Sequence, residues 1–155
     1  MKQYRLTKYD PRYRDASGAY TRDEWTFFAQ VGREVGGRTV TLDEYEAVEA
    51  AYIRVVCALV DLAAIGPYHV ADPENAPYAA GSNITLEQLS AVLRSLLREE
   101  YWCRLSDSEG YFIHSGWDFY LYLGLPNTIV APETIAAEQG LFLEPFVSPY
   151  HSEAP

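Results

Sequence analysis

Three side chains in the second half of the chain, Cys103, His114 and Asp118, are of the types that build a nucleophilic catalytic site. A cysteine becomes a nucleophile when a neighbouring histidine takes its proton, and an acidic residue can orient that histidine. The three residues lie on successive segments of one strand-rich stretch, so adjacent strands could bring them together. Their meeting depends on strand register, because a slip of one residue reverses the face of every side chain. A cysteine between Trp102 and Arg104 in a strand is more often a core residue, so we expect no catalytic site here.

Metal ligation and nucleotide binding have no support in the sequence. The three histidines, His69, His114 and His151, fall on separate segments, and no HxH, HxxxH or CxxC spacing occurs. Glycine-rich phosphate-binding motifs and the GxSxG motif are also missing. Glu46 and Glu49 are spaced by three in an expected helix, but without histidine partners such a pair indicates a solvated helix face. We therefore predict neither a metal site nor a cofactor.

Aromatic residues are unusually frequent, with thirteen tyrosines, three tryptophans and six phenylalanines. Tyrosine combines a large contact area with a polar tip, which suits a recognition surface. In the stretch 101–125 several aromatic residues lie near acidic ones, and they would form an acidic, aromatic patch on one face of a sheet. The alternative is that these rings fill the core. The predicted partner-binding residues are Trp102, Asp107, Glu109, Trp117, Asp118, Tyr120 and Tyr122.

The net charge of -10 is unevenly distributed along the chain. Residues 1–40 carry eight lysines and arginines against five acids, a charge of +3, whereas residues 41–155 carry four against seventeen, a charge of -13. Such an acidic body repels phosphate backbones, which disfavours direct nucleic-acid binding, and it attracts a basic protein partner. Acidity that serves only solubility is the alternative explanation.

The stretch 101–125 should form the centre of the fold and position these residues. Turn signals at 107–110 and 115–116 divide it into three runs rich in aromatic and aliphatic residues, which is typical of an antiparallel meander. Because side chains alternate along a strand, one face should be aliphatic and the other polar and rich in tyrosine.

Helices are predicted where a threonine is followed three residues later by glutamate or glutamine, the pattern of a capping box. Apolar residues then recur every three or four positions, as expected of amphipathic helices. The fold class is therefore α+β, a central antiparallel sheet with three main helices packed largely on its aliphatic face. The helices should span about 22–34, 42–65 and 86–100. Shorter elements are a strand at 4–9, a strand at 68–71, a loop at 72–83, a helix at 132–139 and a strand at 141–146.

The length of 155 residues suits one domain over residues 1–150, followed by a loose tail at 151–155. No apolar run reaches the roughly 18 residues that a membrane span needs, so no membrane association is expected. The N-terminus lacks the apolar region of a secretory signal, which predicts a cytoplasmic address. In that reducing compartment Cys57 and Cys103 should be free and act as small hydrophobic residues.

Four segments resemble, in the same order, a family of small, largely uncharacterised bacterial cytoplasmic proteins. These segments are TKYDPRYRDASGAYTRDEWT (7–26), TLDEYEAVEAAYI (41–53), LREEYWCRL (97–105) and GWDFYLYLG (116–124). The size, acidity and α+β character are also similar to those of bacterial toxin-immunity proteins. That likeness implies a non-enzymatic protein that covers the active cleft of a basic toxin domain. Two alternatives stay open: a small enzyme or ligand-binding domain with a pocket near Cys103 and His114, and a phage or host-defence adaptor.

Overall fold

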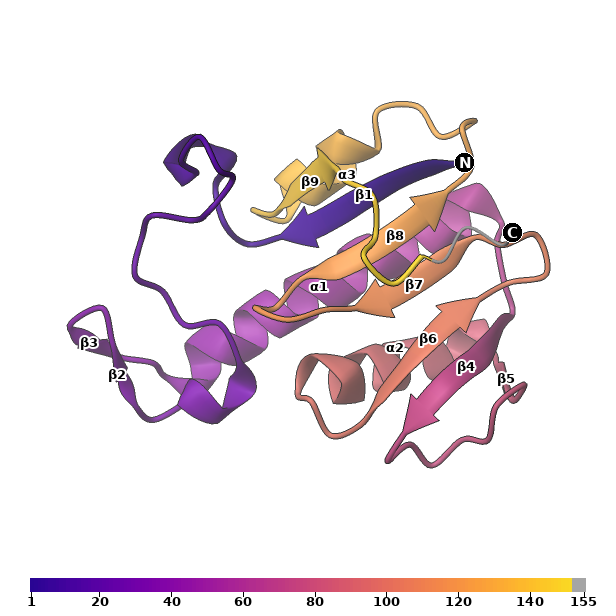
Figure 1. The fold of residues 1–155 in the computed structure, drawn as a ribbon, viewed down its shortest axis with the longest axis horizontal. Helices are drawn as coiled ribbons and strands as arrows, with labels where there is room; N and C mark the ends of the chain where they lie inside the picture. Colours follow the sequence, from indigo (N-terminus) through magenta and orange to yellow (C-terminus); the bar gives the residue numbers. More distant parts are fainter. Residues whose placement is uncertain (152–155) are drawn as a thin grey trace.

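The computed structural model describes residues 1–151, which form three helices and a seven-stranded antiparallel sheet (Figure 1). The predicted α+β class is therefore confirmed. In sheet order the strands are β5 (Asn83–Ile84), β4 (Tyr68–Glu74), β6 (Trp102–Ser106), β7 (Phe112–Ser115), β8 (Leu121–Leu125), β1 (Lys2–Thr7) and β9 (Phe142–Pro145). The helices are α1 (Leu42–Ala63), α2 (Leu86–Leu97) and α3 (Pro132–Glu138). Smaller elements are the 3-10 turns η1 (Pro11–Tyr13) and η2 (Phe28–Gln30) and a hairpin of β2 (Glu34–Val35) and β3 (Arg38–Thr39).

The meander predicted at the centre of the sheet is present as β6, β7 and β8. Its register pairs Leu105 with Ile113 and Ile113 with Leu123, so these side chains share the face that α1 and α2 cover (Figure 1). Arg104 pairs with His114, and His114 with Tyr122, which places these three on the opposite face. The alternation of the sequence thus translates directly into an aliphatic face and a polar, aromatic face.

Helices α1 and α2 begin where the threonine patterns predict them. Thr41 Oγ1 accepts a hydrogen bond from the Glu44 amide at 3.2 Å, and Thr85 and Gln88 cap each other reciprocally at 3.4 and 2.9 Å. Helix α2 ends at Leu97, before the predicted end at residue 100. Glu99, in the connection that follows, adopts a left-handed φ of 56°. Within residues 1–151, no helix combines the length and the apolarity that crossing a membrane requires.

The helix predicted at 22–34 does not exist. Thr21 Oγ1 donates to the Tyr13 carbonyl at 2.6 Å and is not a helix cap, and Gln30 Oε1 accepts from the Thr26 amide at 2.7 Å. The segment instead contains η2 and ends at Glu34, the first residue of the β2–β3 hairpin. Trp25 is buried, 5.0 Å from Phe119 between ring centroids. Contacts distant in sequence therefore override the local helix signal, which is worth only a fraction of a kcal/mol per residue.

Strand β4 is longer than predicted. It continues to Glu74, through residues that were expected to lie in the loop at 72–83. The pairing of β4 with β6 is irregular between Ala71 and Glu74, and Asp72 there has a φ of 47°. An irregularity of this kind lets a strand continue past residues with low strand propensity. The connection to β5 is consequently confined to residues 75–82.

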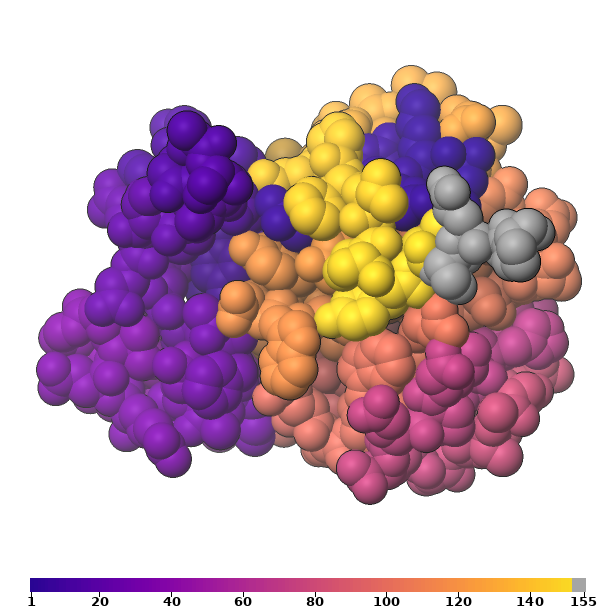
Figure 2. Space-filling view, in the orientation of Figure 1, coloured from indigo at the N-terminus to yellow at the C-terminus, as the bar shows by residue number. Residues whose placement is uncertain are grey.

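Part of the polar face of the sheet is covered by the C-terminal segment, defined here as Phe146–His151. Figure 2 shows this yellow segment lying across the orange strands. The Ser148 amide donates to Gln3 Oε1 at 2.9 Å, Arg104 Nη1 donates to the Tyr150 carbonyl at 2.7 Å, and the His151 ring stacks on Phe112 at 4.9 Å. Of the predicted loose tail at 151–155, only His151 belongs to the described residues.

Gly124 in β8 is required by the close approach of Phe112. A Cβ at position 124 would lie 2.5 Å from two Phe112 ring carbons and 2.7 Å from Met1 Sδ. We expect Gly124→Ala to lower the free energy of unfolding by about 1–2 kcal/mol, as for other overpacked sites. Chemical denaturation measures this change. The control is Phe112→Leu combined with Gly124→Ala, which should cost less than the sum of the two single changes; strict additivity would contradict the proposed clash.

Candidate functional site

The catalytic candidates Cys103, His114 and Asp118 do not meet. Since Arg104 pairs with His114, the adjacent Cys103 points to the opposite face of the sheet, where it is fully buried. Burial raises the pKa of the Cys103 thiol to about 11, so the reactive thiolate is suppressed. Asp118 lies exposed in the β7–β8 connection, and its main-chain carbonyl accepts from Tyr9 Oη at 2.8 Å. These three residues therefore do not form a nucleophilic site.

One of the acids in the first two turns of α1 is buried and paired with an arginine, contrary to the prediction. Glu49 was expected on a solvated face, but it is only 3% exposed. Its carboxylate accepts from Arg98 Nε at 2.7 Å and from Arg98 Nη2 at 2.9 Å, a bidentate ion pair that joins α1 to the end of α2. Among residues 1–151 no group of three His, Cys, Asp or Glu side chains could hold a metal ion.

The predicted partner-binding residues divide between the two ends of the meander. Trp102 and Trp117 lie at the end where the α2–β6 and β7–β8 connections meet, whereas Asp107 and Glu109 lie in the β6–β7 turn at the other end (Figure 1). The five residues of β6 separate the ends by roughly 15 Å. The Asp107 carboxylate also accepts from the Glu109 and Tyr111 amides, both at 2.9 Å, so it shapes the turn.

Tyr120 and Tyr122 contribute mainly to packing. Tyr122 is 7% exposed, and its ring lies 5.8 Å from that of Phe146 in the C-terminal segment. The Tyr120 hydroxyl accepts from Arg14 Nη1 at 3.1 Å, and the Arg5 guanidinium lies 4.6 Å from the Tyr120 ring centroid. These two residues hold the N-terminal and C-terminal segments on the sheet.

A groove of about 390 Å³ opens at the end of the sheet that carries Trp102 and Trp117. This volume falls within the range of about 300–1,000 Å³ that is common for ligand pockets. The end of β4, the α2–β6 connection, the β7–β8 connection and the C-terminal segment all contribute side chains. We call it the acidic aromatic groove, after four rings and three carboxylates in its lining: Tyr101, Trp102, Trp117, Tyr150, Glu74, Glu99 and Glu100.

The rings of the groove differ in how firmly they are held. Trp102 Nε1 donates to the Ser115 carbonyl at 2.8 Å, and the Trp102 ring lies 5.5 Å from that of Tyr150. Trp117, by contrast, is 77% exposed, the most accessible aromatic side chain at this end of the sheet. A side chain at Gly116 would collide with the Tyr122 ring, 2.5 Å away, so glycine lets the β7–β8 connection pass close to the sheet. Trp102 is thus held by a hydrogen bond and a ring contact, whereas Trp117 presents most of its surface to solvent.

The groove is negatively charged. No lysine or arginine contributes to its lining, and within residues 1–151 none of its three carboxylates takes part in an ion pair. The nearest cation along β6 is Arg104, which is already bound to Asp72 and to the Tyr150 carbonyl. A cationic group that entered the groove would therefore meet carboxylates free to pair with it.

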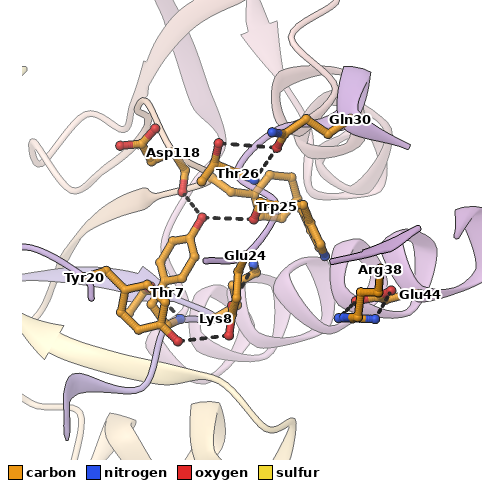
Figure 3. Close-up of polar contacts among 12 residues, drawn as sticks. Thr7, Lys8, Tyr20, Glu24, Trp25, Thr26, Gln30, Arg38, Glu44 and Asp118 are labelled. Atoms are coloured by element: carbon orange, nitrogen blue, oxygen red, sulfur yellow. Dashed lines mark hydrogen bonds and ion pairs between the residues drawn. The ribbon is translucent and has the colours of Figure 1, made fainter. Parts of the chain in front are cut away.

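A second cavity, of about 380 Å³, lies beside Lys8, the residue that follows β1, whose side chain is drawn with its neighbours in Figure 3. Lys8 Nζ lies 3.1 Å from Glu24 Oε2, 4.1 Å from the Trp25 ring centroid and 4.4 Å from that of Tyr9. Burial lowers the pKa of the Lys8 amine, whereas Glu24 opposes that shift. Because the amine is already paired, we interpret this cluster as the contact that ties the segment containing Trp25 to the sheet.

Of the groove's four rings, Trp102 and Trp117 were predicted as partner-binding residues, whereas Tyr101, Tyr150 and the three carboxylates were not. Tyr101 and the acids Glu99 and Glu100 precede Trp102 directly, so the run of acids before an aromatic strand was a usable signal. Tyr150 had no such signal, because its place over the sheet depends on contacts with Trp102 and Arg104 far away in the sequence. Glu74 was assigned to a loop, whereas the structure puts it at the end of β4.

In the groove, two of the predicted partner-binding residues, Trp102 and Trp117, lie beside three carboxylates and a hollow of suitable volume. The likeness to small bacterial proteins and to immunity proteins stays a prediction. Comparison of the chain with protein-family models, with curated proteins and with solved structures gave no match.

Proposed function

We propose that this chain is a non-enzymatic, cytoplasmic binding protein of immunity type, which neutralises a basic toxin domain. The observation that carries the proposal is the acidic aromatic groove, in which four rings and three carboxylates lie together without a lysine or arginine. The charge of -13 over residues 41–155 makes the electrostatic field around the groove negative, like the groove itself. Acidic proteins of this kind fit basic partners and repel phosphate backbones.

Charge and aromatic rings would make different contributions to such a complex. The acidic body would speed association with a basic partner, an effect that salt screens over about 10 Å at 0.1 M. Exposed tryptophans supply the large apolar contacts that dominate binding energy in many interfaces. Trp117 is placed to act in this way, because it is largely exposed beside the groove.

An enzyme that uses Cys103 and His114 has less support. The two side chains lie on opposite faces of the sheet, and Cys103 is fully buried while His114 is 4% exposed. The His114 ring is also engaged by Ser148 Oγ at 2.9 Å. Opening of the C-terminal segment would expose His114 alone, because Cys103 belongs to the hydrophobic core on the other face.

The test is titration calorimetry with a basic toxin domain encoded beside this chain's gene. We expect a complex whose affinity falls as salt rises, and Trp117→Ala should weaken it at least thirtyfold, about 2 kcal/mol, as for a hot-spot tryptophan. Val130→Ala is the matched control, because Val130 is 87% exposed and lies outside the groove. Absence of a complex, or equal losses in the two variants, would count against the proposal.

A further inference from the structure

We infer that the acidic aromatic groove binds the guanidinium group of an arginine side chain, which a basic partner inserts between the rings. This inference rests on the proposed function and adds the chemical group that the groove recognises. A guanidinium is planar, cationic and rich in hydrogen-bond donors, so it needs aromatic faces for its plane and carboxylates for its edge. The groove offers both kinds of group within one hollow.

The aromatic wall is formed before any ligand arrives. Trp102 is fixed by its indole hydrogen bond to the Ser115 carbonyl at 2.8 Å. Tyr150 is fixed through its main chain, because its amide donates to Ser148 Oγ at 3.2 Å and its carbonyl accepts from Arg104 at 2.7 Å. A preformed wall loses little conformational freedom on binding, which favours affinity for a small group.

The carboxylates of the groove come from two separate parts of the chain. Glu99 and Glu100 follow α2, and Glu74 ends β4, so acids from two separate elements border the same hollow. All three side chains belong to exposed residues, and none is engaged by a cation within the described part of the chain. A forked donor can bond to two such acceptors at once, which a single ammonium group does with poorer geometry.

The protein itself holds arginine in this manner elsewhere. The Arg5 guanidinium lies 4.2 Å from the Phe146 ring centroid and 4.6 Å from that of Tyr120, while Arg5 Nε donates to Glu144 at 3.0 Å. Arg98 combines the Phe28 ring, at 4.9 Å, with the Glu49 carboxylate. The groove repeats the same combination of rings and carboxylates but is open to an outside group.

The test uses ¹⁵N-labelled protein titrated with blocked arginine (N-acetyl-arginine amide), blocked lysine and blocked citrulline, followed through the indole N–H signals. Blocked arginine should shift the Trp102 and Trp117 signals saturably and leave that of buried Trp25 unchanged. Neutral citrulline, which keeps the shape of the side chain, should bind at least tenfold more weakly, and lysine several-fold more weakly. Equal binding of citrulline or lysine would overturn the assignment to guanidinium.

Two variants locate the binding. Glu99→Gln combined with Glu100→Gln should weaken blocked arginine at least tenfold, whereas Glu109→Gln, with a charge change at the other end of the sheet, should not. Both proteins must keep their thermal unfolding temperature. If arginine leaves the groove signals unshifted while the toxin domain still binds, the inference fails and the proposed function survives. If arginine binds and the toxin domain does not, the proposed function fails alone.

Discussion

Replacement of Arg98 by methionine is expected to lower the free energy of unfolding by about 3 kcal/mol. The change removes both hydrogen bonds to the Glu49 carboxylate, at 2.7 and 2.9 Å, and Glu49 is only 3% exposed in the wild-type structure. Breaking a buried ion pair from one side typically costs about 3–5 kcal/mol. We expect the lower end, because Arg94 Nε already lies 3.4 Å from Glu49 Oε1 and can compensate in part. Urea denaturation at neutral pH measures the loss.

The double variant Glu49→Leu with Arg98→Met separates lost charge from lost contact. Apolar residues of similar volume often replace a buried ion pair at little cost, so the double variant should be more stable than Arg98→Met alone. Arg54→Met serves as the control for removing an exposed arginine from α1, where the Arg54 side chain donates to Gln139. A loss below about 1 kcal/mol for Arg98→Met would show that the Glu49 carboxylate finds water or another partner.

The Glu49–Arg98 pair also connects stability to the proposed binding site. Arg98 is the C-cap of α2, and Glu99, Glu100 and Tyr101 of the acidic aromatic groove follow it directly. Holding Arg98 against α1 therefore fixes the start of the connection that forms one wall of the groove. Binding sites that depend on such supporting contacts lose precision when the support is removed.

Elements encoded by local signals were predicted well. The meander was readable because its turns and its alternation both lie within 25 consecutive residues, and α1 and α2 were readable because capping and periodicity agree. The segment 22–34 carries the sequence pattern of a helix cap, but within residues 1–151 no other surface of the protein packs against it as a helix. Its Thr21 hydroxyl and Trp25 ring find partners on Tyr13 and Phe119 instead, and no local pattern reports such contacts.

The site was predictable in part, for the same reason. Trp102 and Trp117 belong to the meander, so their placement at one end of the sheet follows from strand and turn positions. The exposure of Tyr120 and Tyr122 could not be read from alternation, because alternation distinguishes two faces and does not say what covers them. Tyr122 is covered by Phe146 of the C-terminal segment, whereas Tyr120 is engaged by Arg5 and Arg14. The C-terminal segment is held on the sheet by contacts of Ser148 with Gln3 and His114 and by the hydrogen bond from Arg104 to the Tyr150 carbonyl.

The buried imidazole beneath that segment should make the protein sensitive to mild acid. His114 is 4% exposed, stacks on Phe112 at 4.2 Å and contacts Ser148 Oγ. Burial, with smaller contributions from Arg104 and His151, lowers the pKa of His114 to about 3. An imidazole in the unfolded chain has a pKa near 6.5, so between these values the unfolded state binds more protons. Stability therefore decreases as the pH falls through this window.

The expected contribution of His114 between pH 7 and pH 5 is a loss of about 2 kcal/mol in the free energy of unfolding. His114→Asn keeps an oxygen near the position of Nδ1 to bond with Ser148, but it cannot take a proton, so its pH dependence should be flatter by that amount. His69→Asn removes an exposed imidazole on β4 and should keep the wild-type slope. Denaturation curves at pH 7, 6 and 5 measure how the free energy of unfolding of each protein depends on pH. Parallel slopes for His114→Asn and the wild type would mean that the C-terminal segment opens readily enough for His114 to reach solvent.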